Sequence, residues 1–562
     1  MKNALFISIS IMLFISSSRC SDTSFGNDLW DNVTSSKITS DKQITSFSIN
    51  GYKARINGTT IKSVLPIGTS ATSLAPVITH NGAAISPESG SVQDFTTPVS
   101  YTVTAKDGTT AVYTVSVNVL SLADMSNRNL SVLKVKKGKL QPDFNSGNLP
   151  YLDAPIPFSD SASPAYNDKQ SNSLIAVPEI QLATITINGT PVENGAEHVI
   201  SNLAVGSNTV EIIVTSADES YSNTYTVNMY RAIPIFKTGA GSYSGINPLE
   251  DGATQRGVSW PNPRFRDNGD GTVTDLMTGL MWLKDAKMIT SQYDFDNAVY
   301  HSQNDLLPFA GYYDWYLPNI IELRSLANYG QIGNEYLSSF FSNCSSTDNW
   351  WTSTSFPNNP TLNAYSFDMN ANTITTSDKT STFCVWAVRG ESKFIPKTGQ
   401  INSHVTSLGD DGDLEKGVDW PTPRFHTTTS GTIVDNMTSL MWFPGDDSTP
   451  RTWNDSISFI NNTINPNLGS NFGYNDWIIP NTNQMLTLMN YGESNLNTWL
   501  NSNGVSLSSG AIYWTSTSGN ITPSAFAIYI DFDNQSQFAF FKSTPYKILP
   551  VRLIKPSELI NY

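Results

Sequence analysis

The chain has 562 residues, which is too many for one hydrophobic core and indicates three to five domains. A hydrophobic content of 39% with only 14% charged residues is typical of folded domains rather than of a disordered chain. The formal net charge of -15 repels phosphate groups, so no nucleic-acid partner is expected, and only a covalent anchor would hold the chain at an anionic membrane.

The first 19 residues have the layout of an export signal. Lys2 forms a short basic start, residues 4–15 are an apolar stretch too short to span a bilayer, and three serines follow. Cys20 comes next, and this layout resembles the signal of bacterial lipoproteins, in which the cysteine carries the lipid. Two lipobox positions hold unusual residues, so an ordinary secretory signal is the alternative. We expect an exported protein at the outer membrane or cell surface, attached to the membrane through the lipid on Cys20 alone.

Residues 20–43 are rich in Ser, Thr, Asp and Asn, which predicts a flexible tether. Residues 44–121 consist of short alternating runs separated by Gly, Pro and Asn. The runs 101–105 and 113–117 flank Lys-Asp-Gly, which is typical of a β-hairpin. This pattern predicts an Ig-like β-sandwich.

Residues 122–232 end in the same way, with alternating runs around Asp218. This segment resembles the bacterial cadherin-like β-sandwich family, whereas the preceding one resembles the related Ig-like modules of exported lipoproteins. Both resemblances imply spacer or interaction modules rather than catalysis.

The rest of the chain is an internal repeat, which is the strongest signal in the sequence. Residues 257–265 recur as 417–425, and residues 275–282 recur as 435–442. Three further pairs of segments match: 314–319 with 476–481, 351–355 with 514–518, and 388–389 with 551–552. Residues 237–393 and 397–556 are therefore two copies of one domain.

Each copy contains a helix that the sequence places. Asn319 and Glu322 form a capping-box pattern ahead of an apolar stripe, and Asn481 with Gln484 repeats that pattern. Residues 453–460 also have helical spacing. The flanking segments alternate like strands, so each copy is predicted to be a compact α+β unit.

The motifs Trp-Pro-x-Pro-Arg-Phe, Thr-Gly-Leu-Met-Trp, Asp-Trp-x-Leu-Pro and Trp-Thr-Ser-Thr of the first repeat, which recur in the second with small changes, resemble the Lcl C-terminal domain family, which is named after a bacterial collagen-like adhesin. The resemblance implies a C-type-lectin-like α+β fold and adhesion to an extracellular ligand. The ligand of the namesake adhesin, a sulfated glycosaminoglycan, is not expected here, because the first repeat has 10 Lys and Arg against 16 Asp and Glu.

The chain has three cysteines, and two of them, Cys344 and Cys384, lie in the first repeat. Leu507 and Lys547 occupy the matching positions of the second repeat. Joint absence of both cysteines from one repeat favours a disulfide in the other, in an oxidising compartment. A metal site is the alternative, but two thiols without a nearby histidine make a poor zinc site.

Two acidic segments invite a calcium interpretation. Residues 267–271 lack the alternating acidic spacing of an EF-hand loop, so they are predicted to be a tight turn. Asp410, Asp411 and Asp413 are better candidates for a cation. Calcium is the one cofactor that the sequence brings into consideration, and no cofactor is expected.

Twelve of the 13 tryptophans lie in the repeats, and their recurrence at matched positions indicates core packing for most of them. Trp350 and Trp351 align with Tyr513 and Trp514 beside Ser/Thr-rich segments, and we take these four as candidates for an aromatic platform that binds a glycan or a protein. Each repeat also has a Trp-Pro-x-Pro-Arg sequence, which predicts a structural cation–π pair.

The five histidines form no His-Glu-x-x-His pattern, and no Gly-x-Ser-x-Gly elbow or Walker loop is present, so an enzyme is not expected. The favoured interpretation is an adhesin-like surface protein whose tandem domains bind an extracellular protein or glycan with avidity. An envelope structural protein whose repeats form a homo-oligomer is the alternative. A polysaccharide hydrolase is less favoured, although sequence does not reveal paired carboxylates.

Overall fold

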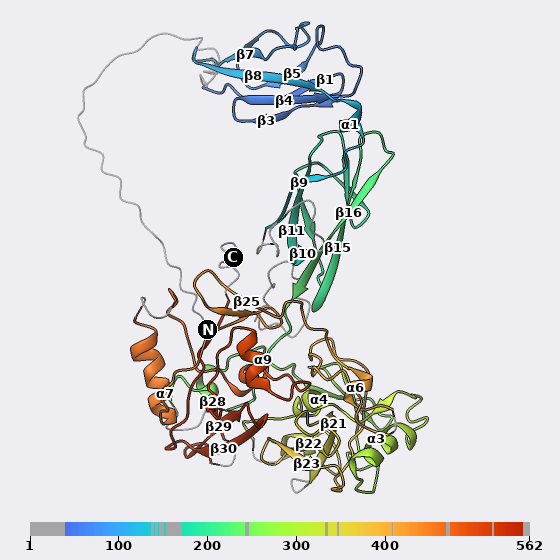
Figure 1. The fold of residues 1–562 in the computed structure, drawn as a ribbon, viewed down its shortest axis with the longest axis vertical. Coiled ribbons are helices and arrows are strands. Elements are labelled where there is room, and N and C mark those ends of the chain that lie inside the picture. Colours follow the sequence, from blue (N-terminus) through green and yellow to red (C-terminus); the bar gives the residue numbers. More distant parts are fainter. Residues whose placement is uncertain are drawn as a thin grey trace, which may run out of the picture. The chain divides into compact units, whose positions relative to one another are not determined.

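The computed structural model describes residues 40–136, 140, 144, 151–152, 171–241, 247–331, 335–344, 348–406, 408–467, 472–519 and 522–554. The predicted signal peptide, Cys20 and nearly all of the predicted tether lie outside these residues. The chain divides into two compact units, Met1–Val119 and Leu120–Tyr562 (Figure 1). Within the described residues, no helix is both long enough and apolar enough to cross a membrane.

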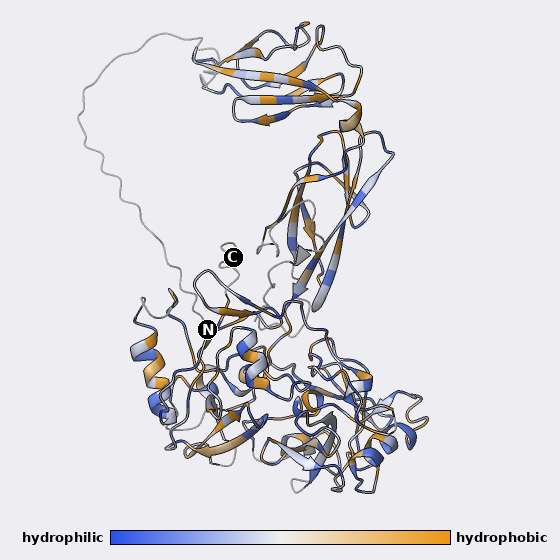
Figure 2. Ribbon diagram, viewed as in Figure 1, coloured by the Kyte–Doolittle hydropathy of each residue, from blue (hydrophilic) through white to orange (hydrophobic). Residues whose placement is uncertain are grey.

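The first unit contains a β-sandwich, as predicted. Its strands are β1 (Ile44–Ile49), β2 (Tyr52–Lys53), β3 (Arg55–Asn57), β4 (Thr60–Leu65), β5 (Val77–His80), β6 (Ala84–Ser86), β7 (Val99–Thr104) and β8 (Thr110–Val119). They form sheets of order β2-β1-β5 and β3-β4-β8-β7-β6. Hydrophobic residues alternate with hydrophilic ones along the strands (Figure 2), because one face of each sheet covers the core. The predicted hairpin is β7–β8, whose turn is held by Asp107, which accepts from the Thr109 amide at 2.9 Å.

The second unit begins with another sandwich. Its elements are α1 (Leu122–Met125), β9 (Leu130–Val135), β10 (Tyr151–Leu152), β11 (Asn172–Pro178), β12 (Thr184–Ile187), β13 (Thr190–Val192), β14 (Glu197–Ile200), β15 (Gly206–Thr215) and β16 (Ser222–Arg231). The two sheets have the orders β10-β16-β15-β12-β13 and β14-β11-β9. The predicted hairpin around Asp218 is β15–β16, in which ten residue pairs are in register.

The two repeats follow, with few and short helices. The first contains α2 (Asp251–Thr254), β17 (Phe265–Asp267), β18 (Thr272–Asp275), β19 (Met281–Leu283), α3 (Phe295–Asn304), β20 (Trp315–Tyr316), α4 (Ile320–Arg324), α5 (Glu335–Ser338), β21 (Asn349–Ser355), β22 (Asn363–Asp368), β23 (Thr373–Asp378) and β24 (Val388–Arg389). The second contains α6 (Asp411–Leu414), β25 (Phe425–Thr427), β26 (Ile433–Asp435), β27 (Leu440–Trp442), α7 (Trp453–Phe459), the π-helix η1 (Ile460–Ile464), α8 (Thr482–Leu486), α9 (Leu496–Ser502), β28 (Ile512–Ser518), β29 (Phe526–Asp531), β30 (Ser536–Phe541) and β31 (Val551–Leu553).

Both predicted capping boxes are confirmed at α4 and α8. The side chain of Asn319 accepts from the Glu322 amide at 2.9 Å, while Glu322 accepts from the Asn319 amide at 2.9 Å. Asn481 and Gln484 do the same in the second repeat. The predicted helix at 453–460 is α7, which continues into η1.

One six-stranded sheet runs through both repeats, in the order β21-β22-β23-β30-β29-β28. The halves meet where Ile374 lies opposite Gln537, and each half repeats the strand order of the other about a pseudo-twofold axis. Each repeat also has a smaller sheet of its own, β17-β18-β19-β24-β20 and β25-β26-β27-β31. The two repeats therefore form one body rather than two independent domains.

The first short helix of each repeat packs against the other repeat. Asp251 of α2 accepts from the hydroxyl of Thr517 in β28 at 2.8 Å. In mirror fashion, Asp411 of α6 accepts from the hydroxyl of Thr354 in β21 at 2.7 Å. We call residues 247–257 and 408–417 the α2 arm and the α6 arm. The reciprocal contacts lock the two repeats together.

A candidate ligand-binding face on the second repeat

An aromatic surface covers the outer face of β29 and β30. In this antiparallel pair Tyr529 lies directly opposite Phe538, and Phe540 follows Phe538 on the same face. The side chain of Phe540 is 40% exposed, and that of Phe541 at the end of the strand is 51% exposed. Large rings with this exposure are unusual on a folded surface and indicate a contact site when they occur as a group.

The rings form a connected cluster. The ring centroids of Tyr529 and Phe538 lie 5.9 Å apart, and those of Tyr529 and Tyr546 lie 5.2 Å apart. Phe540 lies 6.2 Å from Tyr546, which in turn packs on the buried ring of Trp514 at 4.8 Å. The cluster is thus supported from below by the core. We call Tyr529, Phe538, Phe540 and Tyr546 the aromatic face.

Burial raises the pKa of Tyr529 and that of Tyr546 above the ordinary value of a phenol. Both hydroxyls therefore stay protonated at neutral pH and can donate hydrogen bonds. The aromatic face combines flat apolar surfaces with polar groups at its edge, which is suited to binding by stacking and hydrogen bonding.

The first repeat has the same strand pairing but different chemistry. Ser366 lies opposite Thr375, as Tyr529 lies opposite Phe538, and Ser377 takes the place of Phe540. The Ser366 hydroxyl lies 2.9 Å from both the Thr375 and the Ser377 hydroxyl. The two repeats are thus not equivalent on this face.

Thr375 and Ser377, which are partly exposed, lie on the same face of the shared sheet as the aromatic face. At the junction of the halves, Ile374 and Gln537 are both buried and point into the core. Their neighbours in sequence, Thr375 and Phe538, therefore point to the opposite, outer face of the sheet. A ligand that crosses β23 and β30 would meet hydroxyls on one side and aromatic rings on the other.

The predicted aromatic platform is wrong in its residues. Trp350, Trp351, Tyr513 and Trp514 are all 0% exposed. Their strands, β21 and β28, are buried on both faces, and the indole of Trp351 donates to the Tyr293 carbonyl at 2.8 Å. All four rings belong to the core and cannot touch a ligand, and Trp514 is the one shown to support the aromatic face from below.

The acidic residues considered for calcium have other partners. Asp410 is the N-cap of α6 and accepts from the backbone amides of His404 and Asp413. Asp413 accepts from the Gly409 amide at 2.8 Å, and Asp411 accepts from the Thr354 hydroxyl at the interface between the repeats. Within the described residues no group of three or more His, Cys, Asp or Glu is arranged to hold a metal ion. The segment 267–271 is the predicted turn, between β17 and β18.

The predicted disulfide is not formed in the structure, where Cys344 and Cys384 are buried thiols. Both pack in the core of the first repeat, where a thiol is stable as a small apolar side chain. The amide of Gln292 lies 3.7 Å from the Cys384 sulfur, and the Cys344 sulfur lies 3.8 Å from the Phe341 carbonyl oxygen. Burial raises the pKa of both thiols.

The predicted cation–π pairs are confirmed. The guanidinium of Arg264 lies 4.7 Å from the ring of Trp260, and that of Arg424 lies 4.3 Å from the ring of Trp420. Arg264 is itself buried and paired with Asp275 at 3.0 Å. The role of these pairs is structural, as the sequence indicated.

Sequence reasoning missed the aromatic face because it searched for residues that recur in both repeats. The aromatic face is instead a feature in which the two repeats differ. Phe538 and Phe540 lie at alternate positions where the first repeat has Thr375 and Ser377. Alternate aromatic residues on a strand that ends in solvent would have indicated the face.

Comparison with known families assigns most of the chain. The model of the Lcl C-terminal domain matches residues 271–389 and again residues 431–552. Residues 159–232 match the cadherin-like beta sandwich domain, as the sequence indicated. Residues 44–117 match the model described as SGBP, N-terminal, which replaces the broader Ig-like assignment. The two matches confirm that residues from 271 onward contain tandem Lcl C-terminal domains.

No curated protein matches the chain. Among solved structures, a protein named as a candidate glycoside hydrolase from Bacteroides thetaiotaomicron has 16% identity, covers 36% of this chain and 84% of its own, and has a TM-score of 0.15. The C-terminal fragment of intimin in complex with the translocated intimin receptor has 12% identity, covers 62% and 100%, and has a TM-score of 0.14. SGBP-B from Bacteroides ovatus, in complex with a mixed-linkage heptasaccharide, has 10% identity, covers 35% and 74%, and has a TM-score of 0.09. With TM-scores this low, no conclusion about fold or function is drawn from these three structures.

Proposed function

We propose that this chain is an exported, lipid-anchored cell-surface protein whose Lcl C-terminal repeats bind an extracellular glycan through the aromatic face. The observation that carries the proposal is the cluster of four supported, partly exposed rings on one outer face of the shared sheet. Binding rather than catalysis is the role that these residues can perform, because they offer surfaces and hydrogen bonds.

The chemistry of the outer face favours a glycan over a protein ligand. Aromatic rings stack on the C–H faces of sugar rings, and the partly exposed hydroxyls of Thr375 and Ser377 lie on the same face of the sheet beside them, while the buried Ser366 hydroxyl supports both. The match of residues 44–117 to the SGBP N-terminal model supports this choice, because SGBP proteins are surface glycan-binding proteins. The sheets and short helices of each repeat support the proposed relationship to C-type-lectin-like domains.

The binding test exchanges the rings for the residues of the first repeat. The full chain carrying Phe538→Thr and Phe540→Ser should bind its best glycan on an array at least about tenfold more weakly, because the stacking surface is lost. Thr375→Ala with Ser377→Ala removes the neighbouring hydroxyls and should weaken binding by a smaller factor of about threefold. Thr376→Ala, at an exposed position on the opposite face of β23, is the control and should leave the affinity unchanged. The affinities can be measured by isothermal titration calorimetry.

The same variants separate the structural alternative. If Phe538→Thr with Phe540→Ser turns a homo-oligomer into a monomer in light scattering and leaves glycan binding unchanged, the face is a self-association surface. Equal glycan binding by the wild type and the variant, at an unchanged oligomeric state, would remove the aromatic face from the proposal.

The anchor is tested separately at Cys20. Intact-mass analysis of the protein from its membrane fraction should show a mature chain that begins at Cys20 and carries acyl groups. Cys20→Ala should move the protein from the membrane fraction to the soluble fraction. A mature N-terminus beyond Cys20 without lipid would contradict the lipid anchor.

A further inference from the structure

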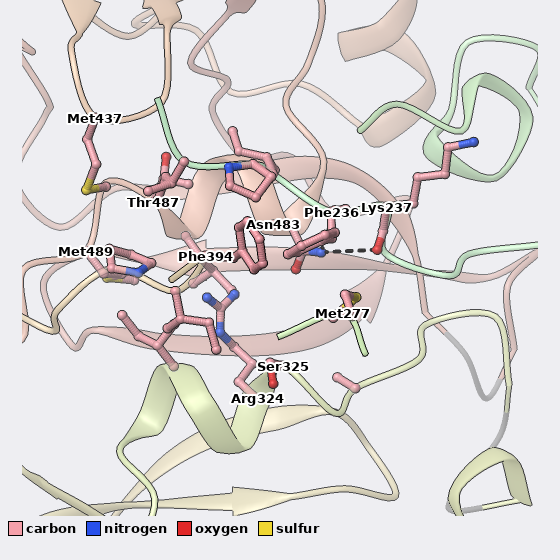
Figure 3. A pocket seen from close by; sticks show the side chains of 18 of the residues that line it. Phe236, Lys237, Met277, Arg324, Ser325, Phe394, Met437, Asn483, Thr487 and Met489 are labelled. Carbon is pink, nitrogen blue, oxygen red and sulfur yellow. Dashed lines mark hydrogen bonds between the residues drawn. The ribbon is translucent and has the colours of Figure 1, made fainter. Parts of the chain in front are cut away.

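Arg324 ends helix α4 and extends into a cavity between the two repeats (Figure 3). The cavity volume is about 90 Å³. That volume is enough for roughly six water molecules or for one small organic molecule. The cavity is not enclosed, so a small solute can enter.

The cavity is built from matched positions of both repeats. Trp260 and Trp420, together with Met277 and Met437, face it from the two sides, and most of the remaining lining is also apolar. Asn483 completes one wall, where its amide donates to the Phe236 carbonyl at 3.0 Å (Figure 3).

The two repeats contribute different side chains at one position of the cavity lining, and only one of the two is charged. Arg324 of the first repeat corresponds to Leu486 of the second, and both residues line the cavity. The remaining charged residues of the lining are Lys237 and Lys397, so the lining contains three cations and no carboxylate. Lys397 is neutralised by Asp419 at 2.7 Å.

The Arg324 guanidinium has no acceptor within the part of the chain that the structure describes. Its Nε and Nη1 atoms are shielded from solvent and make no hydrogen bond. The third nitrogen, Nη2, is not shielded, and the residue is half-buried. Buried N–H donors without an acceptor are costly, and a guanidinium stays protonated. The matching Leu486 shows that this fold accepts an apolar residue here, so the arginine is not required by the packing pattern.

We infer that this cavity binds a short-chain organic monocarboxylate, whose carboxylate pairs with Arg324 and whose apolar tail lies between the tryptophan and methionine side chains. A guanidinium binds a carboxylate through two parallel N–H···O bonds, so the pairing would use the unshielded Nη2 together with Nε or Nη1, which a shift of the flexible Arg324 side chain would bring to the cavity. The cavity is distinct from the aromatic face, and its occupation does not depend on glycan binding.

The test uses the full chain with butyrate as the probe and butyramide as the neutral control. Butyrate should give saturation-transfer NMR signals and raise the melting temperature, whereas butyramide should do neither. Arg324→Leu, which copies the second repeat, should weaken butyrate binding at least about tenfold, and Arg324→Lys should keep part of it. Arg324→Leu should bind the array glycans as the wild type does.

Three results would overturn the inference. The first is that the wild type does not bind butyrate and that Arg324→Leu has a higher melting temperature than the wild type. This result would show that Arg324 destabilises the fold and has no ligand. Another is butyrate binding of equal strength in the wild type and in Arg324→Leu. The third is competition by chloride at the same concentration as butyrate, which would assign the site to inorganic anions.

Discussion

Replacing Asp275 with Ala should lower the free energy of unfolding of the repeat body by about 3–5 kcal/mol, the cost of leaving a buried charge unpaired. Asp275 accepts two hydrogen bonds from Arg264, at 3.1 and 3.0 Å, and both side chains are almost fully buried. The same carboxylate accepts from the Met277 amide and the Thr278 hydroxyl. Its removal would therefore leave the buried Arg264 guanidinium without a counter-charge, with only the Ser325 carbonyl as acceptor, and would leave two local donors without an acceptor.

Urea unfolding followed by tryptophan fluorescence measures this effect, because 12 of the 13 tryptophans lie in the repeats. The control is Asp314→Ala, which breaks the more exposed ion pair with Arg389 and should cost less than about 1 kcal/mol. Equal losses in the two variants would show that burial of the Arg264 pair does not determine its contribution.

The stability of the repeat body should fall as the pH rises from about 4 to about 8. Burial raises the pKa of Asp411 to about 7 and that of Glu322 to about 7, well above the values of both groups in the unfolded chain. At pH values between the unfolded-state and the folded-state pKa values, Asp411 and Glu322 are protonated in the folded protein but ionised in the unfolded chain. The stabilisation is complete below the unfolded pKa values and is lost as the pH passes through the folded ones.

Glu322→Gln should remove most of the Glu322 contribution. The second repeat has Gln484 at this position, in the same capping box, so the amide fits the fold. At about 1.4 kcal/mol per pKa unit, the variant should be more stable than the wild type at pH 8 by roughly 1–3 kcal/mol, and equal to it near pH 4. Asp411→Asn should act in the same direction. Unfolding free energies at pH 5, 6, 7 and 8 provide the measurement, and an unchanged slope in both variants would contradict the assignment.

Local features of the fold were predictable from the sequence. The caps at Asn319 and Asn481 depend on a partner three residues away, and the Asp107–Gly108 turn is specified by its own residues. The Arg264–Trp260 pair likewise joins neighbouring residues. In each case the chemistry and the partner appear within one short window of sequence.

Long-range features were not predictable in this way. The hydrogen bond between Asp251 and Thr517 joins residues 266 positions apart, and the sequence around neither residue indicates its partner. For the same reason, the alignment of Trp350 and Trp351 with Tyr513 and Trp514 did not show that both faces of their strand are covered. The aromatic face appeared only when the outer side of the shared sheet was known.

The exchange of the α2 and α6 arms makes the tandem repeat a dimer fused into one chain. The arm of each repeat packs on the other repeat, so the interface forms only when both repeats are present. Covalent linkage replaces association between separate molecules with a high effective concentration, which keeps the pair closed at any dilution. In a chain truncated to one repeat, the surface that normally contacts the arm of the other repeat would be uncovered, and the arm of the remaining repeat would have no surface to pack on. Two such chains could form a dimer in which each arm packs on the other chain.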